Sequence, residues 1–182
     1  MDNYREAFLI EQIYATLFSL TNKLQVQGDK YFDKLTSRQL MAIVAIAHLK
    51  EDETTLNNIA RKLGNTKQST KQLITVIENK GYVKTVPSKM DKRAVNVTIT
   101  ELGKQVTLEC SKKSINFFAD LSRDFTTEEM EILWLLLKKL YRFDGEVQDG
   151  FEEEAYLETG EDKVEILKRN LEKFGKRRNE KR

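Results

Sequence analysis

The stretch from residue 82 to residue 103 constrains the fold most. Residues 95–99 read Val-Asn-Val-Thr-Ile, and this alternation is the spacing of a β-strand with one buried face. The run Tyr-Val-Lys-Thr-Val at 82–86 predicts a second short strand, which Pro87 should end. A charged tip, Ser-Lys-Met-Asp-Lys-Arg at 88–93, joins them, so we expect a β-hairpin with a basic tip. Its buried face should carry Val95, Val97 and Ile99, and its other face Asn96 and Thr98.

Two short helices are predicted directly before this hairpin. Thr55 can cap a helix over residues 56–63, and Gly64 should end it. After a tight turn, Thr66 can cap a second helix that runs to about Lys80, where another glycine follows. A helix-turn-helix followed by a hairpin looks like a winged helix-turn-helix. We therefore predict a mainly α fold with a small β-hairpin wing and a helical dimerisation region.

The second of these helices has one apolar face and one polar face. Helical spacing places Thr70, Leu73, Ile74 and Ile77 on the buried side. Side chains that can bind bases or phosphates fall on or near the other side: Thr66, Lys67, Gln68, Ser69, Lys71, Gln72 and Thr75. An ordinary solvated helix face is the alternative interpretation of such a run. The turn spacing, the adjoining hairpin and the charge of the region favour a helix that reads the major groove of DNA.

Positive charge is concentrated on this motif. Residues 56–104 hold ten Lys or Arg and three acids, a net charge of +7. The whole chain of 182 residues carries only +2, so the remainder sums to −5. A near-neutral chain with its positive charge gathered on one motif has the electrostatic pattern of a nucleic-acid-binding protein.

The hairpin also carries a specific signature. The chain resembles the multiple-antibiotic-resistance repressor (MarR) family of transcription regulators, whose wing reads Asp-x-Arg, five residues, Leu-Thr, two residues, Gly. Here this appears as Asp91-Lys92-Arg93, then Ile99-Thr100, then Gly103, with Ile in place of Leu as the one departure. The order of the predicted elements over roughly residues 5–143 is also similar to the family pattern.

The resemblance implies a homodimer that binds double-stranded operator DNA and acts as a repressor. In this family a small-molecule effector or an oxidant often releases the protein from its DNA. The resemblance also implies that wing residues enter the minor groove, so Lys89, Lys92 and Arg93 are further candidate DNA contacts. Asp91 should hold Arg93 extended, because residues two apart on a strand project from the same face. The alternative for this pair is an ordinary surface ion pair.

The predicted helices outside this motif form a scaffold for dimerisation. Residues 3–26 carry a wide apolar stripe, and residues 101–143 hold two helices that begin at Thr100 and at the capping box of Thr126 and Glu129. The first of the two should bury Leu102, Val106, Phe117 and Leu121. We expect these helices to pair across a two-fold axis, the alternative being a large monomeric core. The predicted domains are thus 1–143, with a DNA-binding lobe at about 55–100, and an extension at 144–182.

The extension admits several interpretations. Residues 144–162 contain nine acids and no base, which predicts an acidic linker. Val164, Leu167, Leu171 and Phe174 then form a narrow amphipathic seam before a basic end. We expect this end to be a solubilising tail, the alternative being a segment that adds non-specific affinity for DNA. The seam could dock on the dimer, pair with its symmetry mate or bind another protein. The last option gives the alternative function, a protein-interaction module that keeps the winged fold.

Other classes of site find little support in the sequence. The single histidine, His48, excludes zinc sites built on a histidine pair, and its place at a helix end suggests a structural role. The single cysteine, Cys110, falls on a buried stripe, so we expect a packed thiol rather than a redox sensor. No nucleophile–base pattern, cofactor loop or long apolar span stands out, so we expect no enzyme, no cofactor, no metal and no membrane segment. The expected location is the cytoplasm.

Overall fold

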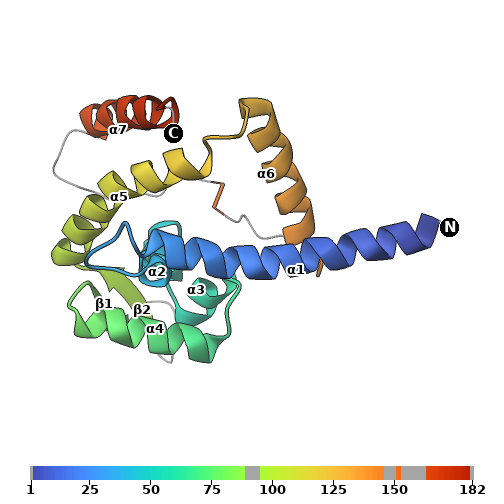
Figure 1. The fold of residues 1–182 in the computed structure, drawn as a ribbon. Coiled ribbons are helices and arrows are strands. Elements are labelled where there is room, and N and C mark those ends of the chain that lie inside the picture. The colour runs from blue at the N-terminus through green and yellow to red at the C-terminus, as the bar shows by residue number, and fades with distance from the viewer. Residues whose placement is uncertain (1, 89–94, 146–150, 153–162, 181–182) are drawn as a thin grey trace.

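The computed structural model describes residues 2–88, 95–145, 151–152 and 163–180. Helices dominate it, and two strands form one antiparallel hairpin (Figure 1). The elements in order are α1 (Asp2–Gly28), α2 (Ser37–Ala47), η1 (Glu51–Glu53), α3 (Leu56–Lys62), α4 (Lys67–Asn79), β1 (Val83–Pro87), β2 (Val95–Ile99), α5 (Glu101–Leu121), α6 (Thr127–Tyr141) and α7 (Lys163–Arg178). The predicted mainly α class with a hairpin wing is confirmed.

A threonine begins each helix from α2 to α6. In every case its side-chain oxygen accepts a hydrogen bond from the backbone N–H three residues later, which satisfies a donor that the helix leaves unpaired. The capping residues are Thr36, Thr55, Thr66, Thr100 and Thr126. Gly64 and Gly81, directly after the caps that end α3 and α4, take positive φ angles of 62° and 75°. These turns match the sequence prediction.

The core lies where α2, α3, α4 and the hairpin meet the first half of α5. Its centre is the apolar helix α2, in which Ala42, Ile43 and Ala45 are fully buried. The other buried apolar residues around it come from α3, α4, both strands and α5: Ile59, Ile74, Ile77, Val83, Val97, Val106 and Cys110. This core extends beyond the lobe of about residues 55–100 expected from the sequence, because it includes α2 and the first half of α5.

The hairpin differs from the prediction in its burial. The first strand ends at Pro87 as predicted, but Pro87 is itself part of the strand and pairs with Val95 at the end of the ladder. Val97 is buried as predicted, but Val95 is exposed and Asn96 is buried, so the predicted alternation is wrong at these two residues. The reason is the segment after α2, which returns to cover this part of β2. The backbone N–H of Val97 donates to the carbonyl of Thr54 at 2.9 Å, and the Asn96 amide reaches the carbonyl of Asp52 at 3.3 Å.

The predicted buried stripe of α5 is correct only in part. Val106 and Cys110 are buried and Phe117 is half-buried, but Leu102 and Leu121 are 49% and 45% exposed. The lobe covers the first half of α5, where Val106 and Cys110 lie, and small residues such as Ser114 and Ala119 are buried further along the helix. The apolar stripe is thus longer than the surface that the lobe offers within one chain.

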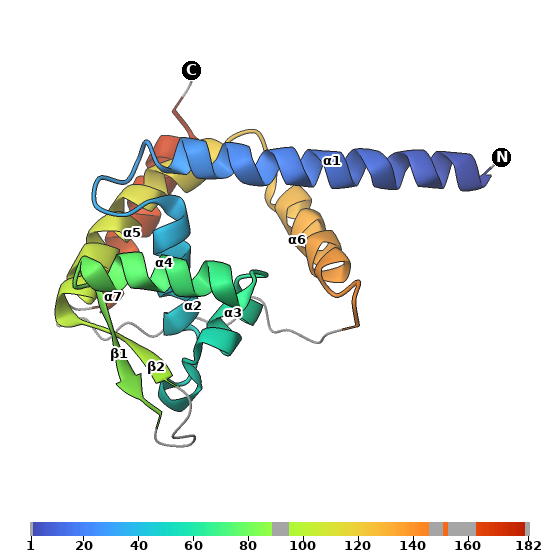
Figure 2. The same cartoon turned by 90° about the horizontal axis from the view of Figure 1, so that it is seen from below.

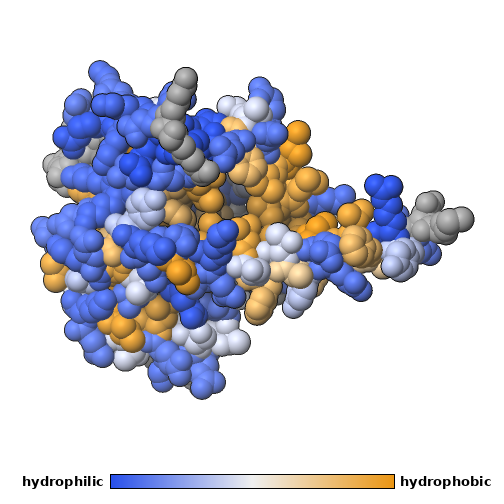
Figure 3. Space-filling model, viewed as in Figure 1, coloured by the Kyte–Doolittle hydropathy of each residue, from blue (hydrophilic) through white to orange (hydrophobic). Residues whose placement is uncertain are grey.

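Helices α1 and α6 expose large apolar surfaces. The N-terminal half of α1 projects away from the rest of the chain in both ribbon views (Figures 1 and 2). Phe18 of α1 is 67% exposed and Trp134 of α6 is 52% exposed. Apolar residues gather over α6 and along α1 on the face seen in Figure 3. Within the described residues no helix is long and apolar enough to cross a bilayer.

Helix α7 lies along α5, on the side away from α4 (Figure 1). Of the four residues of the apolar seam, Phe174 is half-buried and Leu171 is 61% exposed, so this arrangement does not decide among the interpretations that the sequence left open for the seam. The basic end is not only a solubilising tail, since the guanidinium groups of Arg177 and Arg178 both bind residues of the α5 region.

Candidate nucleic-acid interface

Helix α4 is held firmly on the core by its inner face. Thr70, Ile74 and Ile77 are at most 2% exposed, and Leu73 beside them is half-buried. Thr66 fixes the start of the helix by accepting a hydrogen bond from the N–H of Ser69 at 3.2 Å. The inner face agrees with the prediction from helical spacing, and it determines which residues point outward.

The outer face of α4 brings most of the candidate DNA contacts together. Long polar or cationic side chains are exposed there at Lys67, Gln68, Lys71 and Gln72, together with Thr75. The hydroxyl of Thr75 donates to the carbonyl of Lys71 at 2.9 Å, which leaves its oxygen free to accept. Thr66 is exposed at the N-terminal end and Ser69 is half-buried. Amide and ammonium groups at this spacing can bond base edges and phosphates in a major groove.

The remaining candidate DNA contacts belong to the tip of the wing. Lys89, Asp91, Lys92 and Arg93 lie outside the described residues. The strands β1 and β2 that carry this tip are described, with Pro87 opposite Val95 as the last pair before it.

Two residues that connect α4 to its surroundings were missed in the sequence. Oε1 of Glu78 accepts hydrogen bonds from the backbone N–H and the hydroxyl of Thr85 in β1. The ammonium of Lys80 donates to the carbonyl of Lys34 at 3.1 Å and to the side-chain oxygen of Gln39 at 2.9 Å. Charge counting treats Glu78 only as an acid and Lys80 only as a cation, and no local pattern in the sequence indicates either contact.

The second half of the wing signature joins the end of α4 to the start of α5. The hydroxyl of Thr100 donates to the carbonyl of Gly81 at 2.7 Å and accepts from the N–H of Gly103 at 3.0 Å. A Cβ atom on Gly103 would lie 1.9 Å from the carbonyl oxygen of Tyr82. This position therefore requires glycine because the backbone of the turn passes against the first turn of α5.

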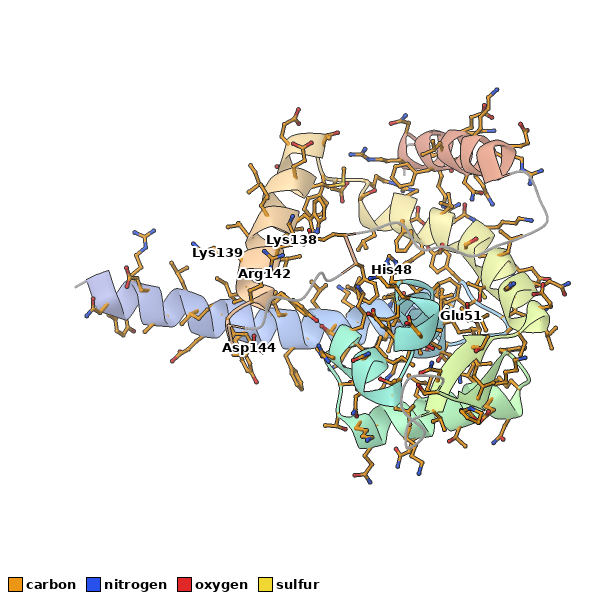
Figure 4. The ribbon with its side chains drawn as sticks, turned by 180° about the vertical axis from the view of Figure 1, so that it is seen from behind. His48, Glu51, Lys138, Lys139, Arg142 and Asp144 are labelled. Carbon is orange, nitrogen blue, oxygen red and sulfur yellow. The ribbon has the colours of Figure 1, made fainter. Side chains whose placement is uncertain are left out.

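A hollow of about 210 Å³ lies beside α6, formed by this helix and the short described segment at 151–152. Glu152 pairs with Arg142 at 3.4 Å and with Lys138 at 3.8 Å. The ring of Phe151 meets His48, at the end of α2, edge-on with the ring centroids 5.3 Å apart. Figure 4 shows Lys138 on α6, with Arg142 directly after that helix and His48 directly after α2. This site is lined by the chain's own Glu152, and no ligand is assigned to it.

The cysteine is packed inside the protein as expected. Cys110 is 3% exposed, and burial raises the pKa of its thiol above the usual value. A protonated, inaccessible thiol is a poor nucleophile toward oxidants. No group of three or more His, Cys, Asp and Glu able to hold a metal ion occurs among the residues that the structure describes.

Comparison with known proteins agrees with this geometry. The pattern of the MarR family matches residues 33–94, which include α2 to β1. The transcriptional regulator SarZ of Staphylococcus haemolyticus is 26% identical over 125 residues, which cover 66% of this chain and 83% of SarZ.

Solved structures show the same fold. A MarR/EmrR family transcriptional regulator from Acinetobacter sp. ADP1 has a TM-score of 0.67 and 21% identity, over 76% of this chain and 99% of that regulator. The S. aureus MepR–DNA complex has a TM-score of 0.63 and 21% identity, over 70% of this chain and 94% of MepR.

Helix α4 packs on α2 and α3, exposes a polar face and is followed by a hairpin. This arrangement defines a winged helix-turn-helix fold. The family match, the curated relative and the wing signature make the assignment more specific. Over residues 33–94 the chain is similar to the MarR family, and the relatives reported above are described as transcriptional regulators.

Proposed function

We propose that this protein is a homodimeric, sequence-specific regulator that binds double-stranded DNA and acts as a repressor in the cytoplasm. The α4 helices of the two subunits enter successive major grooves of a near-palindromic operator, and the wings reach the flanking minor grooves. The observation that carries this proposal is the outer face of α4. Lys67, Lys71 and the amides beside them are exposed, while the residues beneath them are almost completely buried.

A rigid helix with a hydrogen-bonding face suits base readout, because the contacts need no further ordering on binding. MepR, which has a similar fold, forms a complex with DNA, and this supports DNA binding as the function. The wing residues Lys89, Lys92 and Arg93, with Asp91 to orient the arginine, are proposed minor-groove contacts. A narrow, A·T-rich minor groove concentrates negative potential and attracts an extended arginine.

The exposed apolar surfaces of α1 and α6 support the homodimer. The exposed large apolar residues are Tyr4, Phe8, Leu9, Ile10, Ile13, Tyr14, Phe18, Leu20 and Val26 on α1, and Ile132, Leu133, Trp134, Leu135, Leu136, Leu137 and Tyr141 on α6. Soluble monomers rarely expose contiguous apolar surface on this scale. A second copy of the chain would bury the apolar faces of both helices. In this proposal residues 1–143 form the dimeric DNA-binding domain, and residues 144–182 are an extension to it.

The alternative, a protein-interaction module that binds a partner through its C-terminal helix, has less support. Helix α7 already packs on α5 of its own chain, with Arg177 bound to Asp120. The cationic face of α4 would also have no use in such a module.

Selection of bound duplexes from a random DNA pool, read by sequencing, tests the proposal. Recognition helices one helical turn apart should select near-palindromes with half-sites centred about 10 base pairs apart. Recovery of one asymmetric half-site, or a monomer in sedimentation at the concentrations used, would overturn the homodimeric mode of binding. No enrichment of any sequence would overturn sequence-specific binding altogether.

A further inference from the structure

Asp120, near the end of α5, is bound by side chains from three parts of the chain. The hydroxyl of Tyr31, in the turn after α1, donates to Oδ2 at 2.8 Å. Arg123 donates to Oδ1 at 2.6 Å. The guanidinium of Arg177 from α7 bonds the same carboxylate through Nη2 at 2.7 Å and through Nε at 3.2 Å. Such two-pronged arginine–carboxylate bonds are stronger and better oriented than single ones.

The last turn of α7 makes two more contacts at this place. Arg123 also donates to the carbonyl of Arg177 at 3.4 Å, where a cation interacts favourably with the helix C-terminus. Arg178 donates to the carbonyl of Phe125, in the connection between α5 and α6. The ring of Tyr31 packs on Phe117 of α5, with the centroids 5.4 Å apart.

These contacts lie where the end of α5 connects the DNA-binding lobe to α6. Helix α5 leaves the DNA-binding lobe directly after the wing, and its far end leads into α6, whose apolar surface is the proposed dimer contact. The turn with Tyr31 leads into α2, the centre of the lobe. The end of α7 thus touches the residues that fix how α5 leaves the lobe and how α6 follows it.

We propose that α7 is a latch: by binding Asp120 and the α5–α6 connection, it fixes α5 against the Tyr31 turn and so holds the DNA-binding lobe at one setting relative to α6. The inference rests on the proposed function, since the setting matters only if two lobes read one duplex. In a dimer, that setting determines the distance between the two α4 helices. A latched joint has this distance preset, whereas a loose joint must lose freedom on binding, which weakens affinity and relaxes the choice of half-site spacing.

The test compares Arg177→Gln with Lys176→Gln in the full-length protein. Both variants remove one positive charge from the last turn of α7. Lys176 is exposed and has no contact with Asp120 among the hydrogen bonds and ion pairs of the described residues, so it controls for charge. The readouts are hydrogen exchange of the amides of α7, of α5 and of the Tyr31 turn, and affinity for the selected operator. Affinity is also measured for duplexes with one base pair inserted or removed between the half-sites.

Arg177→Gln should speed exchange in α7 and in the Tyr31 turn, and weaken operator binding by about fivefold or more, the usual size of coupling between two sites. The difference in affinity between the natural half-site spacing and the altered spacings should become smaller. Lys176→Gln should change none of these. Tyr31→Phe keeps the bond between Arg177 and Asp120, so the amides of α7 should stay protected from exchange. The difference in affinity between the natural and the altered half-site spacings should still become smaller.

Two results would overturn the latch. One is faster exchange of α7 with unchanged operator affinity and spacing preference, because α7 would then be a docked tail without influence. The other is unchanged exchange of α7 in Arg177→Gln. Failure of the wild-type protein to bind any duplex would instead sink the proposed function. The latch would then be judged on whether exchange of α5 and the Tyr31 turn rises together with that of α7.

Discussion

Glu78, in the last turn of α4, accepts two hydrogen bonds from Thr85 of β1, one from the backbone N–H at 2.7 Å and one from the hydroxyl at 2.9 Å. A carboxylate near the C-terminal end of a helix opposes the helix dipole, and here it also lies in the most basic part of the chain. Its position is explained by the contact with the wing strand. Helix α4 and strand β1 are thereby joined directly.

This contact makes an unusual prediction for Glu78→Ala. Removing a negative charge from the DNA-binding lobe should by itself tighten binding to any DNA. Loss of the wing contact should weaken binding to the operator, by about 1 kcal/mol or roughly fivefold. We therefore expect non-specific affinity to rise and operator affinity to fall, as measured by fluorescence anisotropy at one salt concentration.

Glu78→Gln is the matched control for that measurement. The amide keeps an oxygen that can accept from Thr85 but carries no charge. It should bind the operator at least as tightly as the wild-type protein does. Tighter operator binding by both variants would mean that Glu78 acts through charge alone and does not position the wing.

A second prediction concerns the cations of α4. If Lys71 binds a phosphate, Lys71→Ala in a dimer removes two contacts, and the slope of log K against log salt should shrink by roughly 2. Lys67→Ala should behave in the same way. Lys80→Ala is the control, because its ammonium already bonds Lys34 and Gln39. It should lower the melting temperature with little effect on the slope, and equal slope changes in all three variants would argue against specific contacts by α4.

The features predicted correctly from the sequence depend on local rules. A threonine cap satisfies backbone donors within its own first turn, and glycine at a helix end supplies a positive φ, so neither needs distant contacts. The faces of α4 were also predictable, because Thr70, Ile74 and Ile77 recur at helical spacing over a short, fully packed helix. The outward position of Lys67 and Lys71 follows from the same spacing.

The features that were missed depend on distant segments. Alternation could not show that the segment before α3 returns to cover Asn96 and leaves Val95 exposed. The apolar stripe of α5 could not show where the lobe ends and exposes Leu121. Asp120 and Arg177 are 57 residues apart, and a short seam of apolar residues in α7 fits several partners equally well.

Gly103→Ala adds only one methyl group but should destabilise the protein strongly. The added Cβ would lie 1.9 Å from the carbonyl oxygen of Tyr82 and 2.9 Å from its carbonyl carbon, and backbone cannot move aside as a flexible side chain can. We expect a loss of about 1–3 kcal/mol, or a few degrees in melting temperature. Gly175→Ala in α7, where nothing lies within 4 Å, is the control and should be neutral or slightly stabilising. Equal melting temperatures for the two variants would contradict the close approach.

Cys110 should have no part in sensing oxidants. Its thiol is buried and its pKa is raised by that burial, so little thiolate is present near neutral pH. Operator binding by the wild-type protein should resist peroxide, and Cys110→Ser should cost only modest stability. Release of DNA by peroxide that disappears in Cys110→Ser would show that the thiol becomes accessible and reactive.

The last prediction concerns the dependence of the α7 contact on pH. The pKa of Asp120 is lowered, first by its hydrogen bond from Arg177, with further contributions from Tyr31 and Arg123. Because the pKa in the folded state is depressed, the carboxylate adds stability that is fully present above the ordinary pKa of about 4. That stability is lost as the pH falls through the lowered pKa. The difference in unfolding free energy between the wild-type protein and Asp120→Asn, from urea titrations, should therefore be constant between about pH 5 and pH 8 and shrink below about pH 4. A difference that stays the same down to about pH 3 would mean that the charge of Asp120 does not stabilise the folded protein, and that α7 is held by packing alone.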